Sequence, residues 1–421
     1  MPSDRDPSPR DRSAPPSAAA ARVRMTPSER RATAGLSGIF GLRMLGMFIV
    51  LPVMALYADT LPGGHDRLLG GLALGGYGLT QALFQIPFGW ASDRWGRKRV
   101  IAAGLLVFAA GSCIAAWAPD VGWLIAGRAV QGAGAVGSAV LALTADLTRD
   151  EVRTRAMAVI GISIGATFAL SLVGGPALTA LIGVPGIFAL TGVLALGAIV
   201  MIYRAVPTPD VRRAHAPEAR QWGRVFADGQ LLRLNYGIFA LHACLMALFV
   251  QVPFMLRDGG VGPAQQWAVY LPVLVASVLL MVPALSQADR PGRGKAVFVG
   301  GVTALLAGQL LFATAGTSLP LLIAALVVFF AAFNLMEAML PSLVSKFAPP
   351  DIKGTATGVY SAVQFLGAFL GAAVGGWLSQ HHGGGAVFGF CVALSVAWLA
   401  ICSTMSAPPA YNHRNLSMGE T

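Results

Sequence analysis

The sequence carries little charge for its length. Asp, Glu, Lys and Arg make up 12% of its 421 residues, whereas soluble globular domains carry about 25%. Hydrophobic residues account for 55% of the chain, and the mean hydropathy is +0.66. Such a small number of charged side chains cannot cover a soluble surface of this size, so the composition indicates a membrane protein.

The sequence is also poor in cysteine and in the residue patterns of enzymes. Its four cysteines all fall inside apolar runs, and none has the spacing of a metal ligand or of a disulfide framework. It contains no HExxH pattern, no pair of aspartates inside an apolar run and no nucleophile motif. We therefore expect no bound metal, no cofactor and no enzymatic activity.

Long apolar runs, by contrast, are frequent. Windows of about 20 apolar residues predict twelve membrane-spanning helices. These spans lie near 33–57, 68–91, 100–117, 121–145, 156–181, 185–203, 234–256, 266–288, 296–316, 319–344, 354–379 and 386–405. The sequence thus predicts an all-α membrane protein of two six-helix bundles, residues 33–204 and 233–405, with a disordered basic tail at 1–32 and a second tail at 406–421.

The basic residues are distributed unevenly over the predicted connections. All Lys and Arg except Arg43, Arg67, Arg128 and Arg257 fall in the tails or in connections on one side of the membrane. Cytoplasmic loops are the ones enriched in Lys and Arg, so both termini and the 205–232 linker are predicted to be cytoplasmic. This asymmetry accounts for the net charge of +11 without a nucleic-acid partner. The linker segment Gln221–Phe226 is predicted to be a short helix at the lipid interface.

One charged loop stands between the second and third predicted spans. It reads Gly89-Trp-Ala-Ser-Asp-Arg-Trp-Gly-Arg-Lys-Arg99, and Asp289-Arg-Pro-Gly-Arg293 repeats its core after the eighth span. A loop with this many charges cannot lie in hydrocarbon, so it marks a membrane boundary. Its spacing resembles the loop 2–3 signature of the major facilitator superfamily, whose fold is two six-helix bundles related by weak internal symmetry.

Further segments resemble particular branches of that superfamily. Gly127–Gly134 is similar to its fourth-helix motif, and Gly161–Pro176 is similar to the fifth-helix motif of drug/proton antiporters, although Leu178 and Thr179 replace a glycine pair. The segments Leu42–Phe48, Tyr77–Gly89 and Asn334–Ser342 resemble bacterial transporters of the YajR type. The resemblance implies a bacterial inner-membrane antiporter, and we expect this chain to lack the carboxy-terminal soluble domain of the familiar member.

The resemblance implies a conformational latch at the loop. Asp93 would lie against the amino terminus of the eleventh helix, near Gly354, in the outward-facing state alone, and Arg97 and Asp146 would hold it there. A carboxylate at a helix amino terminus is worth about 0.3–2 kcal/mol. The alternative is a permanent surface ion pair worth about 0–1 kcal/mol. Gly89, Arg94 and Gly96 complete this predicted latch.

Four residues are candidates for proton coupling. Glu337 is the only acid well inside a span, where an ionised carboxylate costs several kcal/mol and therefore calls for a proton or a cation. His242 titrates in a suitable range, and Arg128 occupies the family position tied to proton transfer. Arg43 could face an intramembrane acid or the substrate. The alternatives are a structural acid bonded to Asn334, a packed histidine and arginines bonded to backbone carbonyls.

A second group of residues falls on the helices that line the cavity in this family. Methionines, aromatic rings and amides suit a broad, mostly apolar pocket, although each could equally be ordinary helix packing. The predicted cavity residues are Met47, Tyr77, Gln81, Gln85, Phe249, Tyr360 and Gln364. Gly165, Gly175 and Pro176 are predicted to serve close helix packing or hinge bending.

The sequence therefore predicts a proton-coupled exporter of small amphipathic or drug-like molecules that works by alternating access. It would act as a monomer in a lipid membrane, with protons and a small-molecule substrate as its ligands. Nutrient uptake by symport or facilitation is the alternative within transport. A scaffold or sensor that does not transport is the alternative outside it. The sequence does not identify the substrate.

Overall fold

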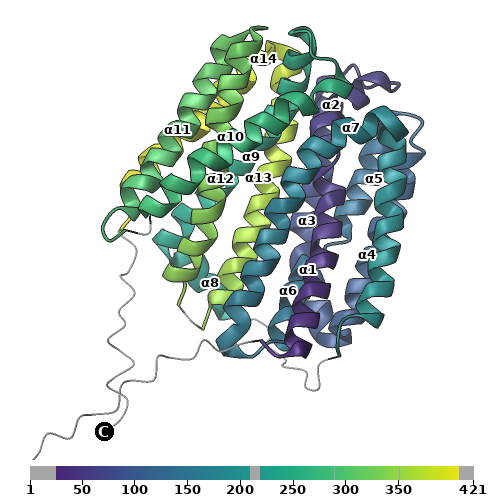
Figure 1. Ribbon diagram of the computed structural model, residues 1–421, viewed down its shortest axis with the longest axis vertical. Coiled ribbons are helices and arrows are strands. Elements are labelled where there is room, and N and C mark those ends of the chain that lie inside the picture. The colour runs from purple at the N-terminus through teal and green to yellow at the C-terminus, as the bar shows by residue number, and fades with distance from the viewer. Residues whose placement is uncertain (1–24, 209–218, 289, 350, 407–421) are drawn as a thin grey trace, which may run out of the picture.

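The computed structural model describes residues 25–208, 219–288, 290–349 and 351–406, and its regular elements are all helical (Figure 1). Residues 27–32, predicted to be disordered, instead begin the first helix. Thr26 and Glu29 form a capping box there, in which each side chain accepts a hydrogen bond from the other's backbone N–H. Glu29 also accepts a hydrogen bond from Arg149 Nε at 2.8 Å, so this turn is held by a contact far along the sequence.

The first half of the chain forms seven helices. They are α1 (Pro27–Phe48), α2 (Leu51–Thr60), α3 (Arg67–Trp95), α4 (Arg97–Ala116), α5 (Val121–Ala133), α6 (Gly137–Asp146) and α7 (Asp150–Arg204). The first and fourth predicted spans are each broken into two helices, at 49–50 and 134–136. The fifth and sixth spans run together in α7, which is kinked where Gly183 takes φ 67° and ψ 172°, a conformation that favours glycine.

The second half forms longer and less interrupted helices. They are α9 (Gly229–Asp258), the short η1 (Pro263–Gln265), α10 (Trp267–Ala288), α11 (Gly294–Ala315), α12 (Leu319–Phe347), α13 (Lys353–His382) and α14 (Gly384–Ser403). Ten helical segments in the described residues are long and apolar enough to cross a membrane. Counting α7 as two crossings and adding the glycine-rich α3 accounts for the twelve predicted spans.

The linker contains α8 (Ala219–Ala227), which overlaps the short helix predicted from the sequence. Val225 is fully buried, and Arg224 forms an ion pair with Asp351, two residues before α13. This guanidinium lowers the pKa of the Asp351 carboxyl. At the other end of the linker, Lys98 Nζ donates to the Val206 carbonyl at 2.6 Å. The linker is therefore attached to the first half at Val206 and to the second half at α8.

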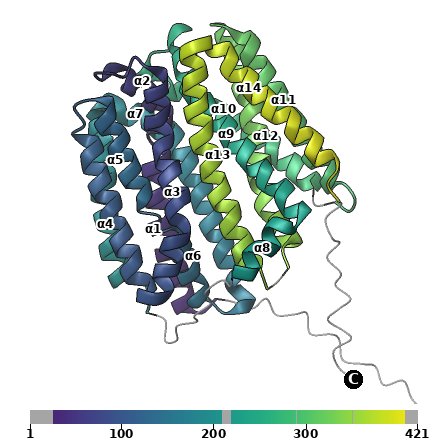
Figure 2. The ribbon, with the colours of Figure 1, turned by 180° about the vertical axis from the view of Figure 1, so that it is seen from behind.

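The two halves lie side by side, α1–α7 on the right of Figure 1 and α9–α14 on the left, and the view from behind agrees (Figure 2). They meet most closely where α3 crosses α13. A Cβ atom added to Gly71 would lie 2.3 Å from the Ala372 carbonyl oxygen, and one added to Gly376 would lie 2.4 Å from that of Arg67. Only glycine allows this approach. We call this side of the molecule the Arg67 end.

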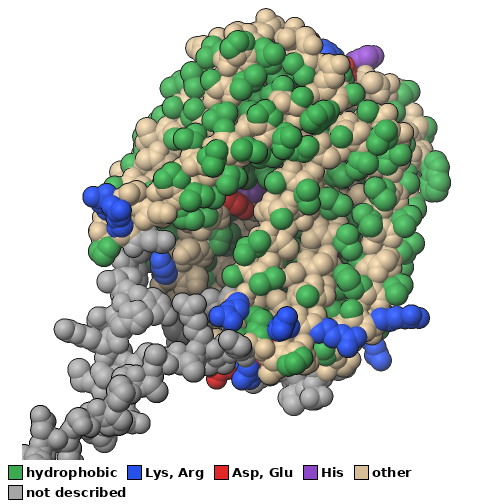
Figure 3. All heavy atoms as spheres, in the orientation of Figure 1, with side chains coloured by type: hydrophobic (Ala, Val, Ile, Leu, Met, Phe, Trp, Pro, Cys, Tyr) green, Lys and Arg blue, Asp and Glu red, His purple; other side chains and the backbone are tan. Residues whose placement is uncertain are grey.

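The opposite side, which carries the charged loop, is more open, and we call it the Asp93 end. Figure 3 shows a hollow between the halves in which acidic and histidine side chains are visible. Near the start of α13, Cβ atoms added to Gly354 and Gly358 would meet nothing within 4 Å. The halves are thus closed together at the Arg67 end and separated along part of the Asp93 end.

Candidate functional site

The second half brings two of the predicted proton-coupling residues together. Gln364 Nε2 on α13 lies 2.8 Å from His242 Nε2 on α9 and 3.5 Å from Glu337 Oε1 on α12. His242 is 7% exposed, and its Nδ1 lies 3.3 Å from the Ile238 carbonyl oxygen. Three helices therefore supply one connected polar group, with an amide between the acid and the imidazole.

One oxygen of the Glu337 carboxyl has no hydrogen-bond donor in this group. Its Oε2 is buried and has no hydrogen-bond partner among the described residues. Asn334, the neighbour considered for a structural bond, instead donates to Ser277 Oγ at 3.1 Å. The Tyr360 hydroxyl, on the same helix as Gln364, is also buried without a partner in the described part of the chain. A carboxyl with a buried, unpaired oxygen costs much less free energy when it carries a proton than when it is ionised.

The first half holds a separate polar group around Arg43. The guanidinium donates from Nη2 to Gln81 Oε1, and Gln81 Nε2 donates to Gln85 Oε1 at 2.7 Å. Ser138 Oγ on α6 donates to the Gln85 carbonyl at 2.9 Å. Arg43 is 2% exposed, and its Nε and Nη1 atoms have no acceptor among the described residues. Among the described residues, a side-chain amide accepts from this arginine, rather than the backbone carbonyls considered from sequence.

Arg128 belongs to a third polar group. Its Nη1 donates to Gln131 Oε1 at 2.9 Å, and its Nε donates to the Ala73 carbonyl at 3.4 Å. Its guanidinium also lies 5.0 Å from the centre of the Tyr77 ring. The four candidates for proton coupling therefore occupy three side-chain groups, of which only one joins two of them.

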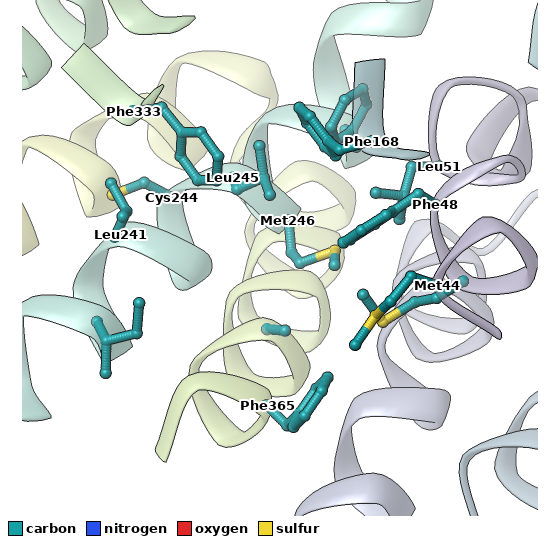
Figure 4. Close-up of a cluster of buried hydrophobic side chains, with 14 of the residues drawn as sticks. Met44, Phe48, Leu51, Phe168, Leu241, Cys244, Leu245, Met246, Phe333 and Phe365 are labelled. Carbon is teal, nitrogen blue, oxygen red and sulfur yellow. The ribbon is translucent and has the colours of Figure 1, made fainter. Parts of the chain in front are cut away.

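Apolar side chains of the two halves meet in a buried cluster. In Figure 4, Phe48 points toward Met246 and Met44 lies across from Phe365. Phe168 of α7 bridges the halves, because its ring centre is 5.1 Å from that of Phe48 and 5.9 Å from that of Phe333. Sequence analysis missed Phe168 and Phe333. Phe333 lies one helical turn before Glu337, and this spacing was the available signal.

The predicted cavity residues divide by their exposure. Gln364 is half-buried, whereas Met47, Gln85 and Tyr360 are 5–7% exposed. Tyr77, Gln81 and Phe249 are at most 1% exposed, and Phe249 packs against Tyr270. These three side chains are not exposed in this conformation, and their contact with substrate stays a prediction.

The charged loop forms the ion pairs that the resemblance implies. Gly96, with φ 97°, turns the chain from α3 into α4. The first residue of α4, Arg97, pairs with Asp93 and places its Nε 3.0 Å from Asp146 Oδ2. Its Nη1 donates to Ser92 Oγ at 2.7 Å. Arg97 thereby ties the end of α3 to the end of α6.

Two other residues of the predicted latch help to shape this loop. A Cβ atom on Gly89 would lie 3.5 Å from Ser138 Oγ, so α3 approaches α6 there. The Arg94 guanidinium lies 5.6 Å from the centre of the Trp90 ring. These contacts keep the end of α3 in place beside α6.

The two glycines predicted to serve helix packing differ. A Cβ on Gly175, beside Pro176 in α7, would lie 2.3 Å from the Ile49 carbonyl oxygen, at the break between α1 and α2. A Cβ on Gly165 would meet nothing within 4 Å. The prediction of close packing at Gly165 is therefore wrong for this conformation. The reason is that α1 packs on another face of α7, where Gly41 meets Thr167.

A further group at the Arg67 end was not predicted. The Arg67 guanidinium lies 3.5 Å from the centre of the Phe254 ring, and the Arg67 N–H donates to Gln380 Oε1 at 2.8 Å. Arg257 Nη1 lies 3.9 Å from Asp59 Oδ2. Of the four arginines that depart from the charge asymmetry, Arg67 and Arg257 are the two that lie near the outer ends of spans rather than inside them. Their unusual position was a signal that they pair locally.

Within the described ranges, no group of three or more His, Cys, Asp or Glu could hold a metal ion. The fold and site together define a class: a multi-pass helical membrane protein with buried polar groups inside each of two bundles. A sequence model of the Major Facilitator Superfamily matches residues 36–364 and 237–420. The chain therefore belongs to the Major Facilitator Superfamily of transporters.

Individual relatives agree with this assignment. The chain is 46% identical to the inner membrane transport protein YajR of Escherichia coli (strain K12) over 389 residues, which cover 92% of this chain and 86% of that one. It is 28% identical to the multidrug resistance protein MdtH of Aeromonas hydrophila, covering 85% and 88%. The structure of a bacterial homolog of the human lysosomal transporter Spinster shares the fold, with a TM-score of 0.73 at 14% identity over 90% and 97%. These similarities support a multi-pass inner membrane protein.

Proposed function

We propose that this chain exports small amphipathic molecules in exchange for protons, by alternating access. The observation that carries the proposal is the Glu337 group. It combines a buried carboxyl oxygen that lacks a partner with an amide 3.5 Å from the other oxygen and an imidazole beyond that amide. A carboxyl in such a place binds a proton readily when the surroundings are dry and releases it when water or a cation reaches it.

The two ends of the molecule suggest how binding and release alternate. In the conformation described, the hollow lies toward the Asp93 end and the halves are packed together at the Arg67 end. A proton on Glu337 would leave toward the Asp93 end in this state, and substrate would enter from there. Closure at the Asp93 end and opening at the Arg67 end would then expose the same carboxyl to the other side.

The apolar lining supports the choice of an amphipathic substrate. Phe48 and Phe168 of the first half and Met246 and Phe365 of the second form one buried cluster of rings and a thioether. Methionine and aromatic side chains adapt to ligands of different shape. The name of the MdtH relative, a multidrug resistance protein, agrees with such a substrate.

The direction of transport rests on the orientation of the chain. We place both termini and the 205–232 linker in the cytoplasm of a bacterial cell, because Lys and Arg collect on that side. Single cysteines in the linker should therefore resist a membrane-impermeant thiol reagent in intact cells. Rapid labelling there would mean that the linker lies outside the cell, and the proposed direction of export would then be reversed.

Replacement of Glu337 by glutamine tests the coupling. The purified protein would be placed in liposomes, and accumulation of the anionic amphipathic dye 8-anilinonaphthalene-1-sulfonate would be followed after a pH gradient is imposed. Glu337→Gln should abolish gradient-driven accumulation, because an amide cannot release a proton. Dye binding should persist, and the variant should fold, since the change removes a buried charge rather than a packing group.

The matched control is Glu151→Gln, which removes an exposed acid outside the predicted spans and should leave accumulation unchanged. A Glu337→Gln protein that still accumulates dye in response to pH alone would refute the coupling role. Dye movement in the same direction as the protons would instead favour uptake by symport.

A further inference from the structure

We infer that the molecule carried by this protein bears a negative charge, and that the charge binds between Arg43 and the amino terminus of α6. This inference rests on the proposed transport function and extends it by naming the class of substrate, an amphipathic organic anion. We call the group formed by Arg43, Gln81, Gln85 and Gly137 the Arg43 site.

The first observation is that Arg43 has fewer acceptors than it needs. The side chain is 2% exposed, yet among the described residues only Nη2 has a hydrogen-bond acceptor, Gln81. The Nε and Nη1 donors are buried without one. A buried guanidinium that lacks an acceptor is costly, and in a membrane protein such a charge usually marks a functional site.

The second observation is a helix that begins inside the bundle. The chain leaves the helical conformation at 134–136, and the ten-residue α6 starts at Gly137 without a side-chain cap. The first N–H groups of a helix lack intrahelical partners and carry a partial positive charge, which favours anions. Breaks of this kind within membrane helices serve as anion sites in other transporters.

The two positive groups converge. Arg43 Nη1 would lie 3.5 Å from a Cβ atom placed on Gly137, the first residue of α6, and Gln85 Nε2 would lie 3.6 Å from it. Gln85 Oε1, which accepts from Gln81, would lie 3.7 Å from the same atom. The absence of a side chain at Gly137 lets these groups approach the start of α6. An unpaired guanidinium nitrogen, a side-chain amide and a helix amino terminus thus lie beside one another.

Among the described residues, no acid forms a hydrogen bond or ion pair with Arg43. The neighbours contributed by α3 are the phenol of Tyr77, 6.0 Å from the Arg43 guanidinium, and the amides of Gln81 and Gln85. Arg128 provides the contrast, because Gln131 and the Ala73 carbonyl accept its hydrogen bonds. Arg128 therefore has hydrogen-bond acceptors within the protein, whereas Arg43 Nε and Nη1 have none among the described residues.

The surroundings of the site define the rest of the ligand. Met44 follows Arg43 directly on α1, and Met44 and Phe48 face Met246 and Phe365 across the space between the halves (Figure 4). A carboxylate or phosphate at the Arg43 site would therefore carry its apolar portion over these side chains. Because Arg43 is 2% exposed in this conformation, the side chains around it must move for the ligand to bind.

A matched set of small aromatic compounds tests the inference by equilibrium binding. Naphthoate and naphthyl phosphate are anionic, naphthamide is neutral and naphthylmethylamine is cationic, and all share one ring system. Binding to the protein in lipid nanodiscs would be measured by calorimetry at a single pH without a gradient. We expect both anions to bind about tenfold to hundredfold more tightly than the amide, as charge-assisted hydrogen bonds require.

Two variants remove the preference by different routes. Arg43→Gln removes the charge, and Gln81→Glu supplies an internal carboxylate to the same guanidinium while Gln85 turns its amide to donate. Both should bind the four compounds within about twofold of one another. Gln81→Glu should also raise the thermal midpoint of unfolding, because it pairs a buried charge. Arg43→Lys keeps the charge and should retain a weakened preference for anions.

The outcomes separate this inference from the proton-coupling proposal. A wild-type protein that binds the amide or the amine as well as the anions, or binds no anion at millimolar concentration, overturns the Arg43 site. An anion preference that survives in both Arg43→Gln and Gln81→Glu also overturns it. Loss of gradient-driven transport in Glu337→Gln bears on coupling alone, because the binding experiment uses no gradient.

Discussion

The two ends of the molecule are built from different interactions. At the Arg67 end, the backbones of α3 and α13 approach through glycines, with Gly71 against the Ala372 carbonyl. At the Asp93 end, the described contacts join charged side chains of one half, with Arg97 between Asp93 and Asp146. The first end depends on the fit of two surfaces, and the second depends on charge.

The difference bears on how the protein changes conformation. The energy of close packing changes steeply with distance, so a closed glycine interface is either formed or lost. Charge interactions fall off slowly and can bias a population without fixing it. We therefore expect changes to the glycines of the Arg67 end to shift the conformational balance more than changes to charges at either end.

The largest effect is expected from Gly71→Ala. A methyl group there would lie 2.3 Å from a backbone oxygen of α13, and overpacking of this kind costs about 1–3 kcal/mol. The population closed at the Arg67 end should fall by about 5-fold to 150-fold. Spin labels on cysteines at positions 65 and 381, in a protein without Cys113, would report the distance.

The control for this experiment is Gly76→Ala on the same helix, where the nearest atom lies 3.8 Å away. Both changes raise helix propensity equally, so a shared effect would come from propensity rather than packing. A distance distribution for Gly71→Ala that matches the wild type would mean that the glycine contact does not hold this end closed.

An intermediate effect is expected from Asp93→Asn. The change keeps the size of the side chain and removes the charge that Arg97 contacts. If Asp93 stabilises the state closed at its own end, the loss should be about 0.3–2 kcal/mol, and transport should slow. Labels at positions 99 and 353 should then report a smaller population closed at the Asp93 end. The reference is Glu151→Gln. If Asp93→Asn has the same population closed at the Asp93 end as this reference and transports normally, Asp93 is not a latch.

The smallest effect is expected from Arg257→Gln. Its ion pair with Asp59 spans 3.9 Å, and the arginine side chain is 42% exposed. Exposed pairs contribute about 0–1 kcal/mol, so the closed population at the Arg67 end should change by less than about fivefold. The effect should shrink as salt is added, since exposed charges are screened. A change as large as that of Gly71→Ala would show that charge, not packing, holds this end.

Much of the fold follows from local features of the sequence. The spans could be predicted because hydrocarbon thickness sets their length, and the loop at Asp93 could be placed because its charges exclude it from lipid. The breaks at 49–50 and 134–136 were not predicted. Each is a short interruption of the helix within a continuous apolar run. Apolar composition alone does not predict where the backbone leaves the helical conformation.

The site was predictable one residue at a time but not as groups. Glu337 and His242 stand out because polar side chains are rare inside apolar runs. Their connection through Gln364 depends on how α9, α12 and α13 pack, and this information is not local. Phe168 was missed for the same reason. A phenylalanine in an apolar helix does not show, from the sequence alone, whether it faces the other half.

The linker has a mechanical consequence. Lys98 holds Val206 to the first half, and Arg224 ties α8 to Asp351 in the second half. The chain from Thr208 to Ala219 therefore connects two anchored points. A polypeptide extends by at most about 3.3–3.6 Å per residue, so this length of chain can span at most roughly 36–40 Å. Its anchor points therefore set an upper bound on how far the two bundles can swing apart while both ties hold.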